Sequence, residues 1–327
     1  GTIAGAEDFT GKLSVVEGAA LSDYTDVVVG LPRGFKDHLN FQPSFGPDGR
    51  IYFNQGSHTS TGSPDNKWGL REERLLTAAV LVLDPAKLPS ELPVDVTTAE
   101  GGGTYDPFAD DAPLTIHATG VRSGYDMLWH SNGRLYSGIN GAAAGGTTPG
   151  GNDVPAIRNV TLTTDDLLLA IEPGKYYGHP NPARGEFTLG GGNPTDGVDP
   201  QEIPQYPVGT QPQKNWHEPA FVFGKNLSPN GLVEWTSPVF GDTLGGAILV
   251  TRYSAGDDVA VLVPGPDGRI VETLQGVAGL TQFTDPLDLV LDEQRGHLYI
   301  AEFGGRRITL VRPTDGQSDN VYRRVVE

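Results

Sequence analysis

The sequence predicts an all-β protein made of repeated four-stranded antiparallel sheets, on two observations. A hairpin phrase recurs along the chain: FGPDGRIY at 45–52 returns as WHSNGRLY at 129–136 and as LDEQRGHLY at 291–299. Each copy has an apolar strand, a polar turn with glycine and a second strand that carries tyrosine. The 327 residues also include 45 glycines and 26 prolines, which favour many turns and short strands over helices. Repeats of this kind are typical of a β-propeller.

Runs of β-branched and aromatic residues, bounded by Gly, Pro and Asp, predict the strands. They form four groups along the chain: 26–29, 42–45, 50–54 and 78–83; then 115–119, 125–130, 135–138 and 167–172; then 220–223, 231–235, 247–252 and 259–264; then 272–275, 286–291, 298–301 and 307–312. One more strand is predicted at 11–16. Mild helical character is predicted only at 72–77 and 165–169.

Composition excludes several classes of protein. The net charge of −18 argues against a nucleic-acid partner and predicts a solvated acidic surface, with bound Ca²⁺ as the more specific interpretation. The chain has no cysteine, so it forms no disulfide and has no thiolate metal site or cysteine nucleophile. No apolar run approaches the roughly 18 residues of a membrane span, and no basic segment followed by an apolar core suggests a signal peptide.

Sequence signatures of common hydrolases and nucleotide enzymes are missing. The chain has no Gly-x-Ser-x-Gly elbow, no phosphate-binding loop and no His-x-x-x-His pair. These patterns would mark a serine hydrolase, a nucleotide enzyme and a zinc hydrolase, respectively. The sequence therefore gives no support to these three classes of enzyme.

Three separated motifs point to one family. They are DHLNFQPSFGPDG at 37–49, GVR at 120–122 before an apolar strand, and DDLLLAIEPGKYYGHPN at 165–181. Together they resemble the soluble quinoprotein glucose/sorbosone dehydrogenases, over about residues 27–313. That resemblance implies a six-bladed propeller with pyrroloquinoline quinone (PQQ) and Ca²⁺ at its axis. It also implies oxidation of an aldose or related alcohol, and an extracytoplasmic location.

The strands predicted are too few for six blades. Either further blades lie within 91–113 and 181–218, or an N-terminal piece is missing from this chain. The repeats run nearly end to end, so we expect a single propeller domain over 1–327.

The resemblance implies roles for residues at matching positions. His38 lies seven residues before the phenylalanine of the FGPDG turn, as the family's histidine does. It would take the hydroxyl proton as general base while a hydride passes to the quinone. Arg122 would clamp a carboxylate of the cofactor. By spacing, the backbone carbonyl of Gly141 would be a Ca²⁺ ligand.

Three further cofactor-binding residues match the family less closely. Tyr177 keeps the family's tyrosine, with His179 in place of a tryptophan, although GHPN is also a plain turn. Tyr125 stands where the family has glutamine. Arg252 is the basic residue nearest to the family's lysine position, which falls at Ser254.

Other positions depart from the family pattern. Ser57 stands where the family has the aspartate that orients its histidine, and a hydroxyl does not stabilise imidazolium as a carboxylate does. Asp285 and Leu287 replace two clamping arginines. Charge-assisted pairs contribute about 1.5–3 kcal/mol each, so losing three basic residues would weaken cofactor binding roughly 10³-fold. The alternative function is therefore a non-catalytic propeller that binds a glycan or protein partner.

The candidate base and clamp also have structural interpretations. His38 would then be an axial histidine bonded to backbone carbonyls, and Arg122 would pair with a neighbour such as Asp126. His58 is either a polar residue at the axis or a solvated loop histidine. All three residues therefore need a structure to assign their role.

The sequence suggests two further hypotheses about metal binding. Asp196 and Asp199, in the loop GNPTDGVD at 192–199, have oxygen-ligand spacing that suits Ca²⁺, but they do not complete a calcium-binding loop, and an ordinary acidic loop is the alternative. A third function, a hydrolase or lactonase-type propeller, would need acid and amide side chains around one ion. Its candidate ligands are Asn40, Asp126, Asn140 and Asp288.

Overall fold

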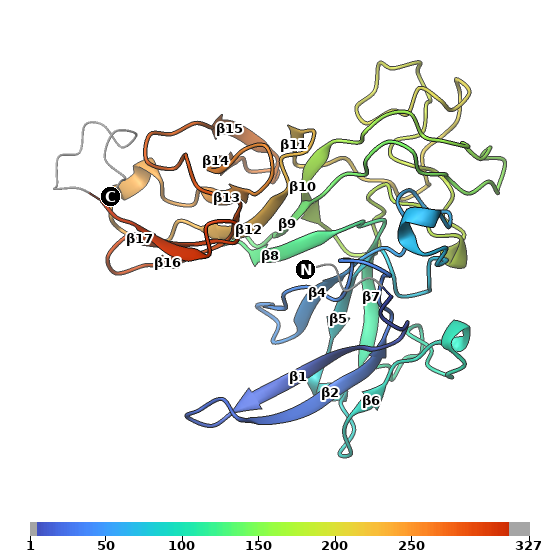
Figure 1. Cartoon of the computed structure of the whole chain (residues 1–327), viewed down its shortest axis with the longest axis horizontal. Helices are drawn as coiled ribbons and strands as arrows, with labels where there is room; N and C mark the ends of the chain where they lie inside the picture. The colour runs from blue at the N-terminus through green and yellow to red at the C-terminus, as the bar shows by residue number, and fades with distance from the viewer. Residues whose placement is uncertain (1–4, 314–327) are drawn as a thin grey trace. The chain divides into compact units, whose positions relative to one another are not determined.

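The computed structural model describes residues 5–313, which form eighteen strands and five short 3₁₀ helices (Figure 1). The strands are β1 (Gly11–Glu17), β2 (Asp23–Leu31), β3 (Ser44–Phe45), β4 (Ile51–Gln55), β5 (Ala79–Leu83), β6 (Val94–Asp95), β7 (Leu114–Thr119), β8 (Gly124–Trp129), β9 (Leu135–Ile139), β10 (Asp166–Ile171), β11 (Phe221–Gly224), β12 (Pro229–Glu234), β13 (Ile248–Arg252), β14 (Asp258–Pro264), β15 (Ile270–Leu274), β16 (Pro286–Asp292), β17 (His297–Glu302) and β18 (Arg307–Val311). The 3₁₀ helices are η1 (Asn66–Trp68), η2 (Pro85–Lys87), η3 (Ala99–Gly101), η4 (Pro182–Arg184) and η5 (Gly241–Thr243).

The chain divides into two compact units. The first unit comprises the chain up to Ser123 together with Ala142–Thr164 and Glu172–Glu218. The second comprises Gly124–Gly141, Asp165–Ile171 and the chain from Pro219 onward. Whether one propeller domain spans the chain, as the repeats suggest, stays a prediction.

The first unit holds two sheets. One has the order β3-β4-β5-β7 and is antiparallel, and the other has the order β1-β2-β6, in which the short β6 pairs parallel with β2. Strand β5 is buried along its whole length, so it reads as a continuous apolar run rather than an alternating one. Leu81 and Leu83 of β5 pack with Phe53 and Leu31 in the core of this unit.

The second unit holds three antiparallel sheets, in the orders β11-β10-β9-β8, β12-β13-β14-β15 and β16-β17-β18. The burial of strand β13 indicates how the three sheets pack, because successive residues of this strand belong to different hydrophobic clusters. Leu249 packs with Val261 in one cluster, whereas Val250 packs with Ala260 in another. A strand buried on both faces belongs to a sheet that lies between two others.

The predicted β-propeller with four-stranded antiparallel blades is confirmed as a fold class, but the number of blades is corrected. The described part of the chain has five sheets, three of four strands and two of three, not six blades. The segment 91–113 contributes only β6, and 181–218 contributes η4 and isolated bridges, so neither hides a blade. The strand predicted at 11–16 is present as β1.

The grouping of strands also differs from the prediction. Strands were predicted in the right places, but β7, β11 and β15 each belong to the sheet before the one expected. Strands β11 and β15 pair with the strands that precede them in the chain, β10 and β14, whereas β7 pairs with β5 across a long excursion that contains β6. Strand positions follow from local pattern, whereas hydrogen-bonding partners depend on the tertiary fold.

Both helical predictions were wrong. Residues 166–169 lie in β10, which pairs with β9 and β11 in the middle of its sheet, and residue 165 precedes that strand. Residues 72–77 form an irregular segment that ends in a turn, where the Thr77 amide donates to the Arg74 carbonyl (3.0 Å). Within residues 5–313, no helix has the length and apolarity that crossing a membrane requires.

Candidate functional site

His38 lies in the loop before β3 and is 6% exposed. Its Nδ1 is 2.9 Å from the Ser57 carbonyl oxygen and 3.0 Å from Ser57 Oγ. A carbonyl only accepts hydrogen bonds, so Nδ1 carries the ring proton and Nε2 of the neutral ring keeps its lone pair. The Ser57 hydroxyl in turn donates to the Thr59 carbonyl (3.0 Å). The geometry therefore presents a neutral imidazole in one tautomer.

The electrostatic surroundings keep this ring uncharged. Burial, together with the positive charge of Arg122, holds the pKa of His38 well below its usual 6.5. The hydrogen bond to the Ser57 carbonyl and the negative charge of Glu73 act in the opposite direction, and they are outweighed. His38 is thus deprotonated at neutral pH, the state that a general base requires.

Trp68 is the aromatic centre of this site. Its ring centroid is 4.2 Å from that of His38, with Arg122 at 5.7 Å and Lys36 Nζ at 5.3 Å. Trp68 ends η1, where Asp65 caps the helix by accepting the Trp68 amide (3.1 Å). Cations over an indole face are attracted by its π electrons. The site thus combines a base, an aromatic surface and two positive charges.

Glu73 is a buried carboxylate that hydrogen bonds surround. It accepts hydrogen bonds from the amides of His58 and Thr59 (3.0 Å each), from the hydroxyls of Thr59 and Thr77, and from His179 Nε2 (3.0 Å). Burial alone would raise the pKa of Glu73, but the hydrogen bonds from His179, Thr59 and the other donors outweigh it and hold that pKa far below its usual value. Glu73 is thus an anion beside the His38 site.

His179 is oriented by this carboxylate. Because Nε2 donates to Glu73, Nδ1 of the neutral ring is an acceptor, and it is buried without a partner in the described part of the chain. Burial lowers the pKa of His179. The sequence places His179 where the family has a tryptophan, and in the structure this residue is buried against Glu73. Glu73 itself was missed, because 106 residues separate it from its histidine partner.

His58 is not a solvated loop histidine. It is fully buried, and its Nδ1 lies 3.0 Å from the Glu72 carbonyl. Its Nε2 lies 3.7 Å from an Asp8 carboxylate oxygen, and burial lowers the pKa of its ring. His58 therefore supports the loop that presents its amide to Glu73.

Arg122 and Tyr177 have defined contacts in the first unit. Arg122 Nε donates to the Ser60 carbonyl (3.0 Å), so the guanidinium is held on the loop that follows β4. Tyr177 is buried, and its hydroxyl accepts the amide of Glu172 (2.8 Å). Burial raises the pKa of Tyr177. Arg122 lies beside His38, while Tyr177 stabilises the turn after β10.

The acidic loop around Asp196 and Asp199 is exposed. Its structure depends on Glu202, which accepts the Thr195 amide (2.7 Å) and hydroxyl (2.9 Å). Across residues 5–313, no three His, Asp or Glu side chains are grouped so as to hold a metal ion. Calcium binding by Asp196 and Asp199 stays a prediction.

In the second unit, Arg252 is committed to an ion pair. Its Nε and Nη2 donate to the Asp258 carboxylate at 2.7 and 2.6 Å, and Nη1 donates to Gln275 (2.5 Å). The amide of Gly141 donates to Asp166 (2.6 Å), which fixes this peptide at the end of β9. An arginine that clamps a cofactor carboxylate needs its positive charge for that carboxylate, and Asp258 already balances the charge of Arg252. Arg252 thus does not fit the predicted role.

Tyr125 lies near two carboxylates of the second unit, Asp126 and Asp288. Burial, and then the charges of Asp288 and Asp126, raise the pKa of Tyr125. Asn140 and Asn230 form an amide pair in the same unit (3.2 Å). Asn40, another candidate ligand of the lactonase-type hypothesis, lies in the first unit, where its Nδ2 donates to the Lys12 carbonyl (2.9 Å). That hypothesis stays a prediction.

The buried carboxyl group of Asp126 is expected to make the free energy of unfolding depend on pH. Burial raises its pKa to about 7, with a further contribution from Asp288, against an ordinary value of 3.8. The folded state therefore keeps a proton between about pH 4 and 7 that the unfolded state has lost, so stability falls as pH rises through this window. We expect Asp126→Asn to remove up to about 4 kcal/mol of this dependence. Urea unfolding at pH 4.5 and pH 8 measures it.

The exposed Glu272 of β15 offers a matched control for this experiment. Glu272→Gln should leave the pH dependence of the unfolding free energy as it is in the native chain. An Asp126→Asn variant with the same slope as the native chain would show that Asp126 is ionised in the fold.

Gly56 determines the position of His38. A Cβ at Gly56 would lie 2.9 Å from His38 Cβ and 3.1 Å from Phe41 Cε2. Overpacking of this kind costs about 1–3 kcal/mol. We expect Gly56→Ala to displace His38 and to lower the free energy of unfolding by about this amount. Urea unfolding of the variant and the native chain tests this, and a variant with native stability would contradict it.

Comparison with known proteins shows the fold. No family model matches the chain, and no curated protein matches its sequence. Among solved structures, the PQQ-bound aldose sugar dehydrogenase from Streptomyces coelicolor is 16% identical, with a TM-score of 0.50 over 89% of this chain and 65% of that one. The soluble aldose sugar dehydrogenase from Escherichia coli is 15% identical, with a TM-score of 0.53 over 91% and 72%.

The PQQ domain of pyranose dehydrogenase from Coprinopsis cinerea is 13% identical, with a TM-score of 0.54 over 91% of this chain and 75% of that one. The chain spans only 63% to 77% of the length of the solved structures that it matches. At these identities the likeness is one of fold, and it confirms the resemblance to sugar dehydrogenase propellers at that level.

Proposed function

We propose that this chain is a quinoprotein-type dehydrogenase of an aldose or related alcohol, with an extracytoplasmic location. The observation that carries the proposal is His38: a buried neutral imidazole whose Nδ1 proton is held by Ser57, so that the lone pair lies on Nε2. A base of this kind is what the removal of a hydroxyl proton requires.

The residues present fit an acidic planar cofactor in part. Trp68 supplies an aromatic surface, and Arg122 and Lys36 supply positive charge beside it, which suits the three carboxylates of PQQ. Arg252 does not fit, because its charge is balanced by Asp258. Tyr177, in the same unit as His38, remains a proposed contact of PQQ, and the roles predicted for Tyr125 and the Gly141 carbonyl in the second unit stay predictions. When bound, PQQ supplies a two-electron acceptor for the hydride.

In this mechanism, His38 Nε2 accepts the proton of the substrate hydroxyl, while Nδ1–H stays hydrogen-bonded to the Ser57 carbonyl oxygen. Arg122 opposes the positive charge that develops on the ring, whereas Glu73 stabilises it. Glu73 thereby supplies the negative charge that the aspartate replaced by Ser57 would provide in the family. We therefore treat Glu73 as a positioning residue and His38 as the catalytic residue.

The proposal is tested by titrating the purified chain with PQQ in the presence and absence of Ca²⁺, followed by dye reduction with a set of aldoses. We expect Ca²⁺-dependent binding and turnover with at least one sugar. Absence of both would contradict the proposal.

One observation favours a second function, a non-catalytic binding module. Arg252 is neutralised by Asp258, and Ser57 provides only neutral acceptors to His38. On this hypothesis the protein binds neither PQQ nor Ca²⁺, and it retains affinity for a glycan or protein partner. The calorimetric titration separates the two functions.

A further inference from the structure

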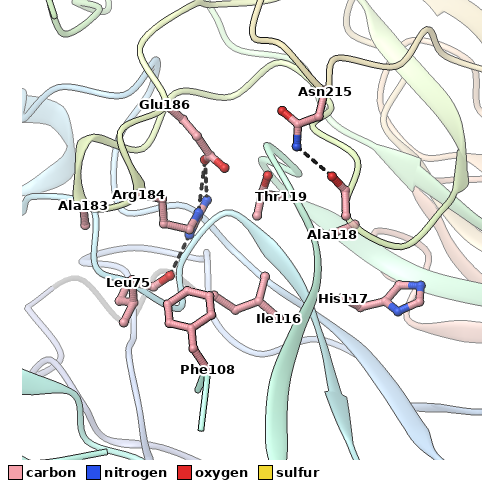
Figure 2. Close-up of a pocket in the computed structure, with 11 residues that line it drawn as sticks. Leu75, Phe108, Ile116, His117, Ala118, Thr119, Ala183, Arg184, Glu186 and Asn215 are labelled. Atoms are coloured by element: carbon pink, nitrogen blue, oxygen red, sulfur yellow. Dashed lines mark hydrogen bonds and ion pairs between the residues drawn. The ribbon is translucent and has the colours of Figure 1, made fainter. Parts of the chain in front are cut away.

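A cavity of about 450 Å³ lies in the first unit, with a lining that does not include His38. It is formed by β7, η4, the turn that carries Phe108 and the segment that carries Asn215 (Figure 2). Pockets that hold small ligands have volumes of about 300–1,000 Å³. One part of its lining is apolar, with Leu75, Phe108 and Ile116, and another part is polar.

The only arginine of the lining has no donor left for an anion. Arg184 Nε and Nη2 donate to Glu186 (3.1 and 2.9 Å), and the remaining bonds go to the carbonyls of Leu75 (2.7 Å), Thr77 (2.6 Å) and Ala78 (3.2 Å). A guanidinium has five N–H donors, and these contacts use all five. Because Arg184 and Glu186 balance each other, the cavity favours a neutral ligand.

Two further polar residues of the lining, Glu186 and Asn215, offer acceptors, and His117 and Thr119 of the same lining can also donate. Glu186 is 6% exposed, and Arg184 engages only its Oε2, so Oε1 keeps its lone pairs. Asn215 donates its Nδ2 to the Gly174 carbonyl (2.7 Å), which leaves Oδ1 as an acceptor. Figure 2 shows both side chains reaching into the same space from neighbouring segments. A ligand that matches them presents hydroxyl donors.

Phe108 adds an apolar platform. Its side chain is 66% exposed, unusual for phenylalanine, and its amide is tied to Asp106 (2.9 Å), which holds the turn in place. Figure 2 shows the Phe108 ring beside the Ile116 side chain. A ligand that covers this ring while it donates to Glu186 and Asn215 has an apolar face and a hydroxyl-bearing edge. A sugar ring has both.

We propose that this cavity binds a neutral saccharide, with the sugar ring against Phe108 and hydroxyl groups donating to Glu186 Oε1 and Asn215 Oδ1. The site is separate from the proposed dehydrogenase site and does not depend on it, because binding requires neither PQQ nor His38. It would hold a saccharide to the protein in addition to any sugar that is oxidised.

The test is a titration of the cofactor-free chain of residues 1–327 with glucose, maltotriose and cellotriose, followed by ligand-observed NMR and calorimetry. We expect saturable binding of at least one saccharide. Phe108→Ala should weaken it about tenfold, since a stacked aromatic contact contributes about 0.5–1.5 kcal/mol. Phe45→Ala, at another exposed phenylalanine of this unit, and His38→Gln should leave the affinity unchanged.

Four results would overturn the proposal: no saturable binding of any of the three sugars, equal affinity of Phe108→Ala and the native chain, loss of binding in His38→Gln alone, or binding of inorganic phosphate that Phe108→Ala abolishes. The third result would place the sugar at the His38 site. Dye reduction with PQQ is measured in a separate experiment. A failure of saccharide binding at this cavity therefore does not contradict the proposed dehydrogenase function.

Discussion

His38→Gln is expected to lower kcat for sugar oxidation by about 10³-fold, the typical contribution of a positioned general base. Glutamine keeps a polar side chain of similar reach but has no lone pair that binds a proton at neutral pH. In the native chain, burial and Arg122 hold the pKa of His38 well below 6.5. The acid limb of the kcat/KM profile should therefore lie well below pH 6.5. Steady-state dye reduction with PQQ and Ca²⁺ measures both.

His217 provides the matched control for this experiment, because its side chain is 34% exposed and lies outside the His38 site. His217→Gln should retain native kcat. A His38→Gln variant that keeps PQQ binding and native turnover would show that another group removes the proton.

Glu73→Gln is expected to have the largest effect on stability. The carboxylate receives hydrogen bonds from two amides, two hydroxyls and His179, and an amide side chain places an NH₂ group against donors in this cage. Leaving buried donors unpaired costs about 1–3 kcal/mol for each group, so we expect a loss of roughly 3 kcal/mol or more. Urea unfolding at pH 7 measures the change in free energy.

Two further measurements separate the roles of Glu73. Thr77→Val removes one donor to the carboxylate and should cost less than Glu73→Gln, which keeps a folded variant available. Removing the negative charge of Glu73 should also lower the pKa of His38, since that charge raises it. A native unfolding free energy in Glu73→Gln would mean that the cage does not stabilise this unit.

Local sequence pattern predicted the strands well. The alternation and the Gly-bounded turns placed β1, β4, β5, β13 and β17 within a few residues of their positions in the structure. The spacing argument that placed Ser57 beside the candidate base was also right, because Ser57 accepts the His38 Nδ1 proton through its carbonyl. These features depend on neighbours in the chain or on a short loop after a known strand.

Other features could not be obtained from pattern alone. Three interactions of this kind are the pairing of β7 with β5, the ion pair of Arg252 with Asp258, and the hydrogen bond from His179 to Glu73. No local motif predicts them, because the fold brings their partners together. Charge balance at a site depends on which acid lies within hydrogen-bonding distance, and the sequence does not contain that distance. Arg252 illustrates this, since it is the basic residue nearest to the expected clamp position, while Asp258 balances its charge.

By itself, the sequence determined the all-β propeller class, the positions of its strands and the histidine to test as a base. Only the tertiary structure decided the number of sheets, the Glu73–His179 pair and the acceptor-lined cavity beside Phe108. The physical reason is that strand propensity and turn chemistry act over a few residues. Burial, hydrogen-bond partners and pKa depend on groups that folding brings together from distant parts of the chain.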